Sequence, residues 1–240
     1  MRAAGREKIL SAPFDLIIFD CDGVLVDSEV ISCRVHAELL TAHGYPISSD
    51  QVRRRFLGRS AWEAGREIEA ELGRALPDDF DAQLKAAIFR EFATTLEATP
   101  HMHETLAAIA LPVCVASSGA PEKIRASLTR TRLHDRFAPH IFSATQVRNG
   151  KPAPDLFLFA AAQMGVPPAR CLVIEDSVPG VTGARAAGMA VFGFHGGSHC
   201  RPGDEAALAA AGATANFDDM RELPAMIAQA TDYTADIAST

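Results

Sequence analysis

The sequence has few of the features that mark membrane, nucleic-acid-binding or secreted proteins. No apolar stretch approaches the roughly 18 residues that a membrane-spanning helix needs. The first residues lack the apolar core of about 7 to 15 residues that is typical of a signal peptide. Lysine and arginine number 23 against 30 acidic residues, and the net charge of −7 argues against a nucleic-acid partner. We therefore expect a cytoplasmic protein that binds neither membranes nor nucleic acid.

Cysteine is also scarce. The five cysteines are odd in number and widely spaced: Cys21, Cys33, Cys114, Cys171 and Cys200. This pattern matches neither a disulfide framework nor a zinc site, so reduced thiols of a cytosolic protein are expected.

What the sequence does contain is an alternation of apolar runs and helical segments. The chain has 240 residues, 48% of them hydrophobic, which is enough for one large or two modest domains. The predicted strands are the runs 14–19, 112–116, 140–143, 171–174 and 190–194. The predicted helices between them are 121–131, 154–164 and 179–187, each near a proline that suits a first helical turn. Continuous apolar strands alternating with helices predict a parallel sheet covered by helices on both faces.

One long interval breaks this alternation. Some eighty residues separate the first two predicted strands, although one crossover helix would be enough to connect them. Helical periodicity occurs at 30–40, 61–72 and 80–96, with breaks at 44–50 and 73–79. The simplest interpretation is a small helical domain inserted at 28–96, with residues 1–27 and 97–240 forming the core.

The first predicted strand ends in an acidic stretch, DCDGVLVDSE. Residues i and i+2 of a strand point to the same side, so Asp20 and Asp22 can converge while Cys21 faces away. Gly23 then permits a sharp turn. Two carboxylates this close repel each other unless a cation or a shared proton lies between them. A hard cation such as Mg²⁺ suits such oxygen ligands.

Other strand ends carry matching chemistry. Ser117 and Ser118 end the second predicted strand before a helix N-terminus, which favours anion binding. Lys151 lies in a loop before the next helix, where it can neutralise phosphate charge. Glu175 and Asp176 end the fourth strand. Because ligands bind outside the carboxyl ends of strands in open α/β sheets, these residues are expected to form one site.

These motifs resemble those of the haloacid dehalogenase-like hydrolase superfamily over about residues 14 to 230. The motifs are Asp20 and Asp22 in DCDGVLVDSE, Ser117, Lys151 in GKPAPD, and Glu175–Asp176 in EDSVPG. The inserted helices resemble the cap of the subgroup that includes β-phosphoglucomutase and small sugar-phosphate phosphatases. The resemblance implies a Rossmann-like three-layer α/β/α core and a cap that closes over the site.

The resemblance also implies roles for the acidic residues. Asp20 would be the nucleophile that forms an aspartyl-phosphate, and Asp22 would be the general acid and base. Mg²⁺ would be held by the Asp20 carboxylate, the Asp22 carbonyl and the Asp176 carboxylate. Glu175 would support this metal site directly or through water.

Further roles concern the phosphoryl group and the rest of the substrate. Ser117, the Ser118 backbone and Lys151 would bind the transferring phosphoryl group. In the cap, Arg59 could pair with a second anionic group and Ser60 could hydrogen-bond a sugar hydroxyl. An alternative interpretation makes Ser60 the N-cap of a helix.

Several alternatives remain at this point. Asp22 argues against a true dehalogenase, and Lys85 is poorly placed to form the Schiff base of a phosphonate hydrolase. A phosphosugar mutase would have a histidine where Ser32 stands, although His36 lies one turn further on. We expect an Mg²⁺-dependent phosphatase of a small sugar or polyol phosphate, monomeric or weakly dimeric. The alternatives are the mutase and a non-catalytic binding protein.

Three further groups of residues have no catalytic role in this interpretation. The only basic cluster, Arg53 to Arg55, is expected to be a solvated helix face, with attraction of an anionic substrate as the alternative. His195 and His199 lie in a glycine-rich loop that is expected near the rim of the site. Asp27, Ser28 and Glu29 are expected to lie outside the acidic centre, as the hinge and N-terminal cap of the first inserted helix.

Overall fold

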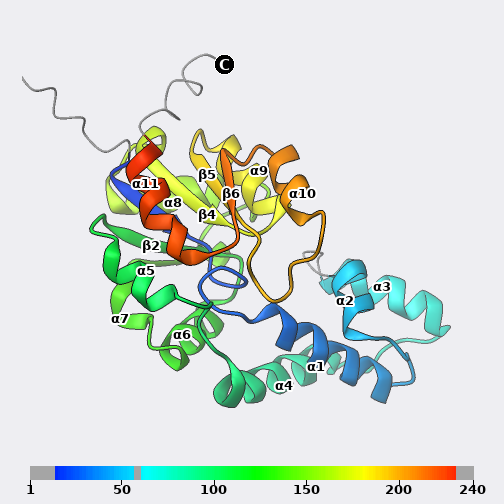
Figure 1. Cartoon of the computed structure of the whole chain (residues 1–240). Helices are drawn as coiled ribbons and strands as arrows, with labels where there is room; N and C mark the ends of the chain where they lie inside the picture. Colours follow the sequence, from blue (N-terminus) through cyan, green and yellow to red (C-terminus); the bar gives the residue numbers. More distant parts are fainter. Residues whose placement is uncertain (1–13, 57–60, 231–240) are drawn as a thin grey trace, which may run out of the picture.

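The computed structural model describes residues 14–56 and 61–230, which form a parallel β-sheet covered by helices, with a further group of helices beside it (Figure 1). The strands lie in the order β3-β2-β1-β4-β5-β6, and neighbouring strands are parallel. They are β1 (Leu16–Phe19), β2 (Val113–Ser117), β3 (Ile141–Ser143), β4 (Cys171–Glu175), β5 (Ala190–Phe194) and β6 (Ala215–Phe217). The predicted α/β fold with a parallel sheet is confirmed.

The helices fall into two groups along the chain. Those between β1 and β2 are α1 (Glu29–Ala42), α2 (Ser49–Phe56), α3 (Ala61–Leu72), α4 (Phe80–Thr95) and α5 (Met102–Ala108). Those after β2 are α6 (Pro121–Arg130), α7 (His134–Phe137), α8 (Asp155–Met164), α9 (Val178–Ala186), α10 (Asp204–Ala210) and α11 (Leu223–Gln229), with 3₁₀ turns at Ala144–Gln146, Pro168–Arg170 and Met220–Glu222. The three predicted proline-initiated helices correspond to α6, α8 and α9.

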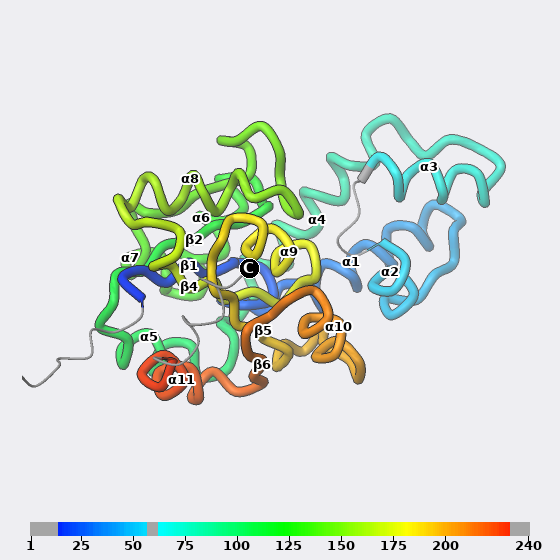
Figure 2. The backbone as a smooth tube through the Cα atoms, turned by 90° about the horizontal axis from the view of Figure 1, so that it is seen from above, coloured from blue at the N-terminus to red at the C-terminus, as the bar shows by residue number. Residues whose placement is uncertain are grey.

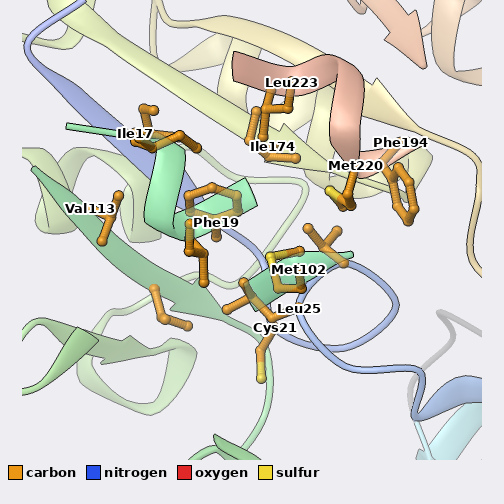
Figure 3. Close-up of a cluster of buried hydrophobic side chains, with 14 of the residues drawn as sticks. Ile17, Phe19, Cys21, Leu25, Met102, Val113, Ile174, Phe194, Met220 and Leu223 are labelled. Atoms are coloured by element: carbon orange, nitrogen blue, oxygen red, sulfur yellow. The ribbon is translucent and has the colours of Figure 1, made fainter. Parts of the chain in front are cut away.

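Strand β1 lies at the centre of the sheet and is buried on both faces. Ile17 and Phe19 belong to a cluster with side chains of α5, α6, α7 and α11, whereas Leu16 and Ile18 pack with α8, α9 and α10. This two-sided burial explains why the strand is a continuous apolar run. Cys21 extends the first cluster and lies near Leu25, away from the polar residues beside it (Figure 3).

Helices α1 to α4 lie together at one side of the molecule (Figure 1 and Figure 2). They have a hydrophobic cluster of their own, which includes Leu40, Phe56 and Ile68. Helix α2 begins inside the predicted break at 44–50, although a helix face was expected at Arg53 to Arg55. Ser48 and Gln51 explain the start of the helix, because they form a capping box. The backbone amide of Ser48 donates to the side chain of Gln51 at 2.9 Å, and the backbone amide of Gln51 donates to the Ser48 hydroxyl at 3.2 Å.

Strand β6 is absent from the strands that the sequence predicts. It has three residues at the edge of the sheet, and only Phe217 of them is fully buried. Half-exposed edge strands lack the continuous apolar run of a central parallel strand, so the sequence pattern did not indicate β6.

Among the described residues, no helix has both the length and the apolar character needed to cross a membrane.

Candidate active site

The end of β1 sets Asp20 and Asp22 at the carboxyl edge of the sheet. The amide of Asp20 still donates to the Ile174 carbonyl of β4, at 3.0 Å, so Asp20 keeps the alignment of the strand. Gly23 follows with a φ of 82°, and a Cβ at this position would collide with the carboxylate of Asp176. The positive φ and the lack of room for a Cβ both require glycine at this position. The turn brings the ends of β1 and β4 together.

Lys151 joins these two strand ends through ion pairs. Its Nζ lies 2.6 Å from a carboxylate oxygen of Asp20 and 2.6 Å from one of Glu175, and its side chain is only 5% exposed. Burial alone would lower the pKa of Lys151, but the charges of Asp20 and Glu175 raise it above its ordinary value. Burial raises the pKa of Asp20 well above its ordinary value, and the Lys151 charge opposes this shift. The lysine is thus a permanent cation beside the predicted nucleophile.

Glu175 is held by the chain that follows it. Its second oxygen accepts hydrogen bonds from the amides of Asp176 and Ser177, both at 3.0 Å, and from the Ser177 hydroxyl at 2.9 Å. The residue is fully buried, and a Cβ on Gly180 would collide with its carboxylate. These contacts fix Glu175 as the support of Lys151.

Three carboxylates form a set that could hold a cation. One oxygen each from Asp20, Glu175 and Asp176 can be chosen so that all lie within 4.8 Å of one another. Burial raises the pKa of Asp176, and the hydrogen bond from His199 opposes this shift. Because three buried carboxylates face a single lysine and one histidine, the donor set fits a hard divalent cation such as Mg²⁺.

Asp22 is held by two side chains that the sequence analysis did not connect with it. Its Oδ1 accepts a hydrogen bond from the Ser28 hydroxyl at 2.6 Å and lies 2.9 Å from Nζ of Lys123 on α6. Ser28 was expected outside the acidic centre, but its hydroxyl turns back to Asp22 because the inserted helices begin directly beside the site. The carboxylate of the predicted acid and base therefore has a fixed orientation.

The remaining predicted core residues face the same cavity, which has a volume of about 700 Å³. Ser117 ends β2, and its hydroxyl accepts a hydrogen bond from the amide of Gly119 at 3.0 Å. Ser118 is exposed and also lines the cavity. The cavity thus collects polar groups from β1, β2, the loop of Lys151 and β4, as the strand-end argument predicts.

The glycine-rich loop that carries His195 and His199 lies closer to the site than expected. Nε2 of His199 is 3.0 Å from Asp176, and the side chain is 7% exposed. Burial alone would lower the pKa of His199, but the hydrogen bond to Asp176 raises it to about 11. His195 is not among the described residues that line the cavity. The glycines near His199 in the sequence were the available signal of this contact. The His199 ring lies so close to Gly23 and Gly197 that a larger residue would not fit at either position.

The basic cluster on α2 was expected to be a solvated face, and this expectation is wrong for Arg53. Its side chain is 18% exposed and lines the cavity together with that of Arg54. Arg55 points elsewhere and pairs with Glu67 at 2.7 Å and Glu71 at 2.5 Å. Helix α2 has distinct faces, so neighbouring arginines have different surroundings.

The predicted cap contacts are only partly described. Arg59 and Ser60 lie outside the described residues. In a mutase of this family, a histidine of the first inserted helix would contact Asp22. The ring centroid of His36 instead lies 6.2 Å from that of Phe56 and 6.1 Å from that of Phe80. Burial lowers the pKa of His36. The histidine therefore belongs to the packing of the inserted helices.

Glu29 also lines the cavity, contrary to its expected position outside the acidic centre. Burial and then the charge of Asp22 raise the pKa of Glu29 to about 7 from an ordinary value of 4.5. A raised acid pKa means that the folded state holds the proton more tightly than the unfolded chain does. The folded state should therefore lose stability as the pH rises from about 4.5 to about 7.

Replacing Glu29 by Gln should remove this loss. Relative to the native chain, the variant is expected to gain on the order of 1–3 kcal/mol of unfolding free energy between pH 5 and pH 8, at about 1.4 kcal/mol per pKa unit. Urea unfolding with EDTA at both pH values measures this gain. The exposed Glu205→Gln is the matched control. A gain that is equal at both pH values would contradict the assignment.

The fold and the cavity define a Rossmann-like α/β protein with a polar site at the carboxyl edge of its sheet, where such sheets bind ligands. The chain belongs to the haloacid dehalogenase-like hydrolase family, whose sequence model matches residues 14–188. The resemblance seen in the sequence and the prediction of a hydrolase are confirmed.

Known proteins agree with this membership. A haloacid dehalogenase-like protein of unknown function from Agrobacterium tumefaciens is 41% identical, with a TM-score of 0.82 over 90% of this chain and 98% of that one. A family hydrolase from Deinococcus radiodurans, solved with phosphate and sodium, is 32% identical, with a TM-score of 0.78 over 92% and 97% of the two chains. The 6-phosphogluconate phosphatase of Escherichia coli is 33% identical over 189 residues, 78% of this chain and 86% of that protein.

Proposed function

We propose that this chain is a Mg²⁺-dependent phosphatase that hydrolyses a small phosphorylated metabolite through an aspartyl-phosphate on Asp20. One observation carries the proposal. The carboxylates of Asp20 and Asp22 face one cavity, and each has its own lysine: Lys151 at 2.6 Å from Asp20 and Lys123 at 2.9 Å from Asp22. This separation lets two nearby carboxylates have different chemical roles.

The proposed reaction has two steps. In the first, a carboxylate oxygen of Asp20 attacks phosphorus while the ester P–O bond breaks, and the protonated Asp22 donates its proton to the leaving oxygen. In the second, the Asp22 carboxylate takes a proton from a water molecule that attacks the same phosphorus. The bond between phosphorus and Asp20 then breaks, which releases phosphate and restores Asp22 in its protonated form.

Lys151, Ser117 and the backbone at Ser118 are proposed to bind the oxygens of the transferring group. A buried lysine and hydroxyl that are fixed in advance stabilise the charge of the transition state without reorganisation. The Asp20 and Asp176 carboxylates, with the Asp22 carbonyl and the support of Glu175, would hold Mg²⁺. When bound, the ion would neutralise part of the negative charge on the carboxylates and the phosphoryl group.

We further propose that residues 28–96 form the cap and that 1–27 and 97–240 form the core. Helices α1 to α4 pack around their own cluster, and α2 contributes side chains to the cavity wall. A cavity of about 700 Å³ has room for a sugar or polyol phosphate. The relative named 6-phosphogluconate phosphatase supports a substrate of this class.

The mutase alternative has less support. It would place a histidine beside Asp22, whereas the described partners of this carboxylate are Ser28 and Lys123. His36 packs against phenylalanines instead. Hydrolysis is therefore the function that the site supports best.

Assays of the purified protein against a panel of phosphate esters test this proposal. Phosphate release with Mg²⁺ is expected, and EDTA should lower the rate by roughly 10²-fold or more. Isomerised sugar phosphate without net phosphate release would establish the mutase instead. Ester binding without turnover would leave a binding protein.

A further inference from the structure

We propose that Arg53 binds a second anionic group of the substrate, a carboxylate or a second phosphate, at the end remote from the transferred phosphoryl group. This inference rests on the proposed function of the cavity and names a substrate class for it. It starts from the three consecutive arginines of α2, which have different partners. Arg54 pairs with Asp50, and Arg55 pairs with two glutamates.

Arg53 differs from its neighbours because its charge is only loosely paired. Its closest acidic oxygens lie at 3.8 Å on Asp50 and at 4.0 Å on Asp204, beyond hydrogen-bond distance. Its Nε is buried and has no hydrogen-bond partner among the described residues. A guanidinium carries five donors, and leaving buried donors unpaired is costly. In the described structure the Nε donor of Arg53 lacks a partner, and the Arg53 side chain lines the cavity, where its guanidinium could meet a ligand.

The position of Arg53 also suits a second anchor. It lines the same cavity as Lys151 but comes from the inserted helices, whereas Lys151 belongs to the core beside Asp20. Arg53 and Asp204 on α10 both line this cavity. A guanidinium fork matches the two oxygens of a carboxylate or a phosphate. A substrate with anionic groups at both ends would thus be held by the core and by the inserted segment together.

Asp204 offers a competing explanation. Arg53 and Asp204 could act as a contact that holds the inserted helices to the core, without touching substrate. Such a contact would affect every substrate equally, whereas an anion-binding residue acts only on substrates with the second anion. The two explanations therefore differ in selectivity, which can be measured.

The decisive experiment uses substrates that differ at one carbon. 6-Phosphogluconate and sorbitol 6-phosphate have the same chain, but the first has a carboxylate where the second has a hydroxymethyl group. Fructose 1,6-bisphosphate and fructose 6-phosphate form the matching pair for a second phosphate. Values of kcat/KM are compared for the native chain, Arg53→Gln, and Arg90→Gln, which removes an exposed arginine of α4 outside the cavity.

In at least one of the two pairs, Arg53→Gln is expected to lower kcat/KM about 10- to 100-fold for the substrate that carries the second anion. The neutral member should change by less than about threefold, as should both members with Arg90→Gln. Equal losses on both members of each pair would overturn the proposal in favour of the contact with Asp204. No loss on any substrate would overturn it as well.

Binding separates this inference from the proposed reaction. Calorimetric titration of the same four compounds, with Mg²⁺, into Asp20→Asn and into Asp20→Asn/Arg53→Gln measures affinity without turnover. The second substitution should weaken only the compounds with a second anion. The native chain could hydrolyse none of the four compounds while the difference in affinity persists. In that case the proposed reaction is wrong and the anion site stands. If the difference is absent, the anion site is wrong.

Discussion

Replacement of Asp20 by Asn is expected to lower phosphate release by at least about 10³-fold, because an amide cannot form the acyl-phosphate bond. The fold should survive the change. Asn has nearly the same shape, and Lys151 keeps its ion pair with Glu175 at 2.6 Å. Since burial raises the pKa of Asp20, loss of its charge should leave the unfolding free energy unchanged or higher.

Two measurements check this result. Phosphate release is followed at saturating substrate with Mg²⁺, and the native protein is quenched during turnover so that intact mass can reveal a phosphoryl adduct. The adduct should be absent from the variant. Asp135→Asn, at a fully exposed carboxylate, is the control for loss of a charge. Release within about tenfold of the native rate would show that Asp20 is not the nucleophile.

Replacement of Lys151 by Met is expected to have the largest effect on stability. The side chain is 5% exposed and lies between two carboxylates, at 2.6 Å from each. Without the lysine, Asp20 and Glu175 remain as buried acids with no cation between them. Removing one partner of a buried pair costs about 3–5 kcal/mol. The rate of ester hydrolysis should fall by roughly 10²-fold or more, because the charge beside the phosphoryl group is lost.

The stability loss should depend on pH. In the native chain the Lys151 charge opposes the upward shift that burial gives the pKa of Asp20. Without this charge the pKa of Asp20 should be higher still in the folded state, so the variant holds its proton more tightly when folded. Its stability should therefore fall more steeply than that of the native chain as the pH rises from 5 to 8. Urea unfolding with EDTA at both values measures this slope.

A matched variant and a second substitution make the test specific. Lys123→Met should cost less, because Asp22 is 14% exposed and keeps its hydrogen bond from Ser28. Adding Glu175→Gln to Lys151→Met should recover part of the stability by removing one uncompensated charge. A Lys151 variant as stable as the Lys123 variant at pH 8 would contradict the assigned role of the buried lysine.

Much of the site was accessible from the sequence because its residues follow strands. The apolar runs predicted the central parallel strands, and the alternation of side chains predicted that Cys21 would face away from Asp20 and Asp22. The structure places Cys21 in the hydrophobic cluster (Figure 3). Ser117, Ser118 and Lys151 were predicted by the same reasoning, since parallel strands end at one edge of the sheet.

Residues on helices and loops were harder to assign. Lys123 is an ordinary polar residue of α6 in the sequence, about one hundred positions from Asp22, and nothing local indicates their contact. Ser28 fits the start of a helix equally well whether or not its hydroxyl turns back to Asp22. His199 depends on the close approach of a glycine-rich loop to Asp176. Such contacts follow from packing between distant segments.

The sequence by itself determined the α/β class, the central parallel strands and the acidic, hydroxyl and lysine groups at their ends. Those features depend on periodicities of two and 3.6 residues and on strand ends, which neighbouring residues specify. Only the tertiary structure decided which lysine pairs with which aspartate, that Glu29 and Arg53 line the cavity, and that Arg55 does not. These distinctions depend on how helices α1, α2 and α6 meet the sheet edge. Contacts between segments far apart in the chain are set by the packing of whole elements, which no local pattern contains.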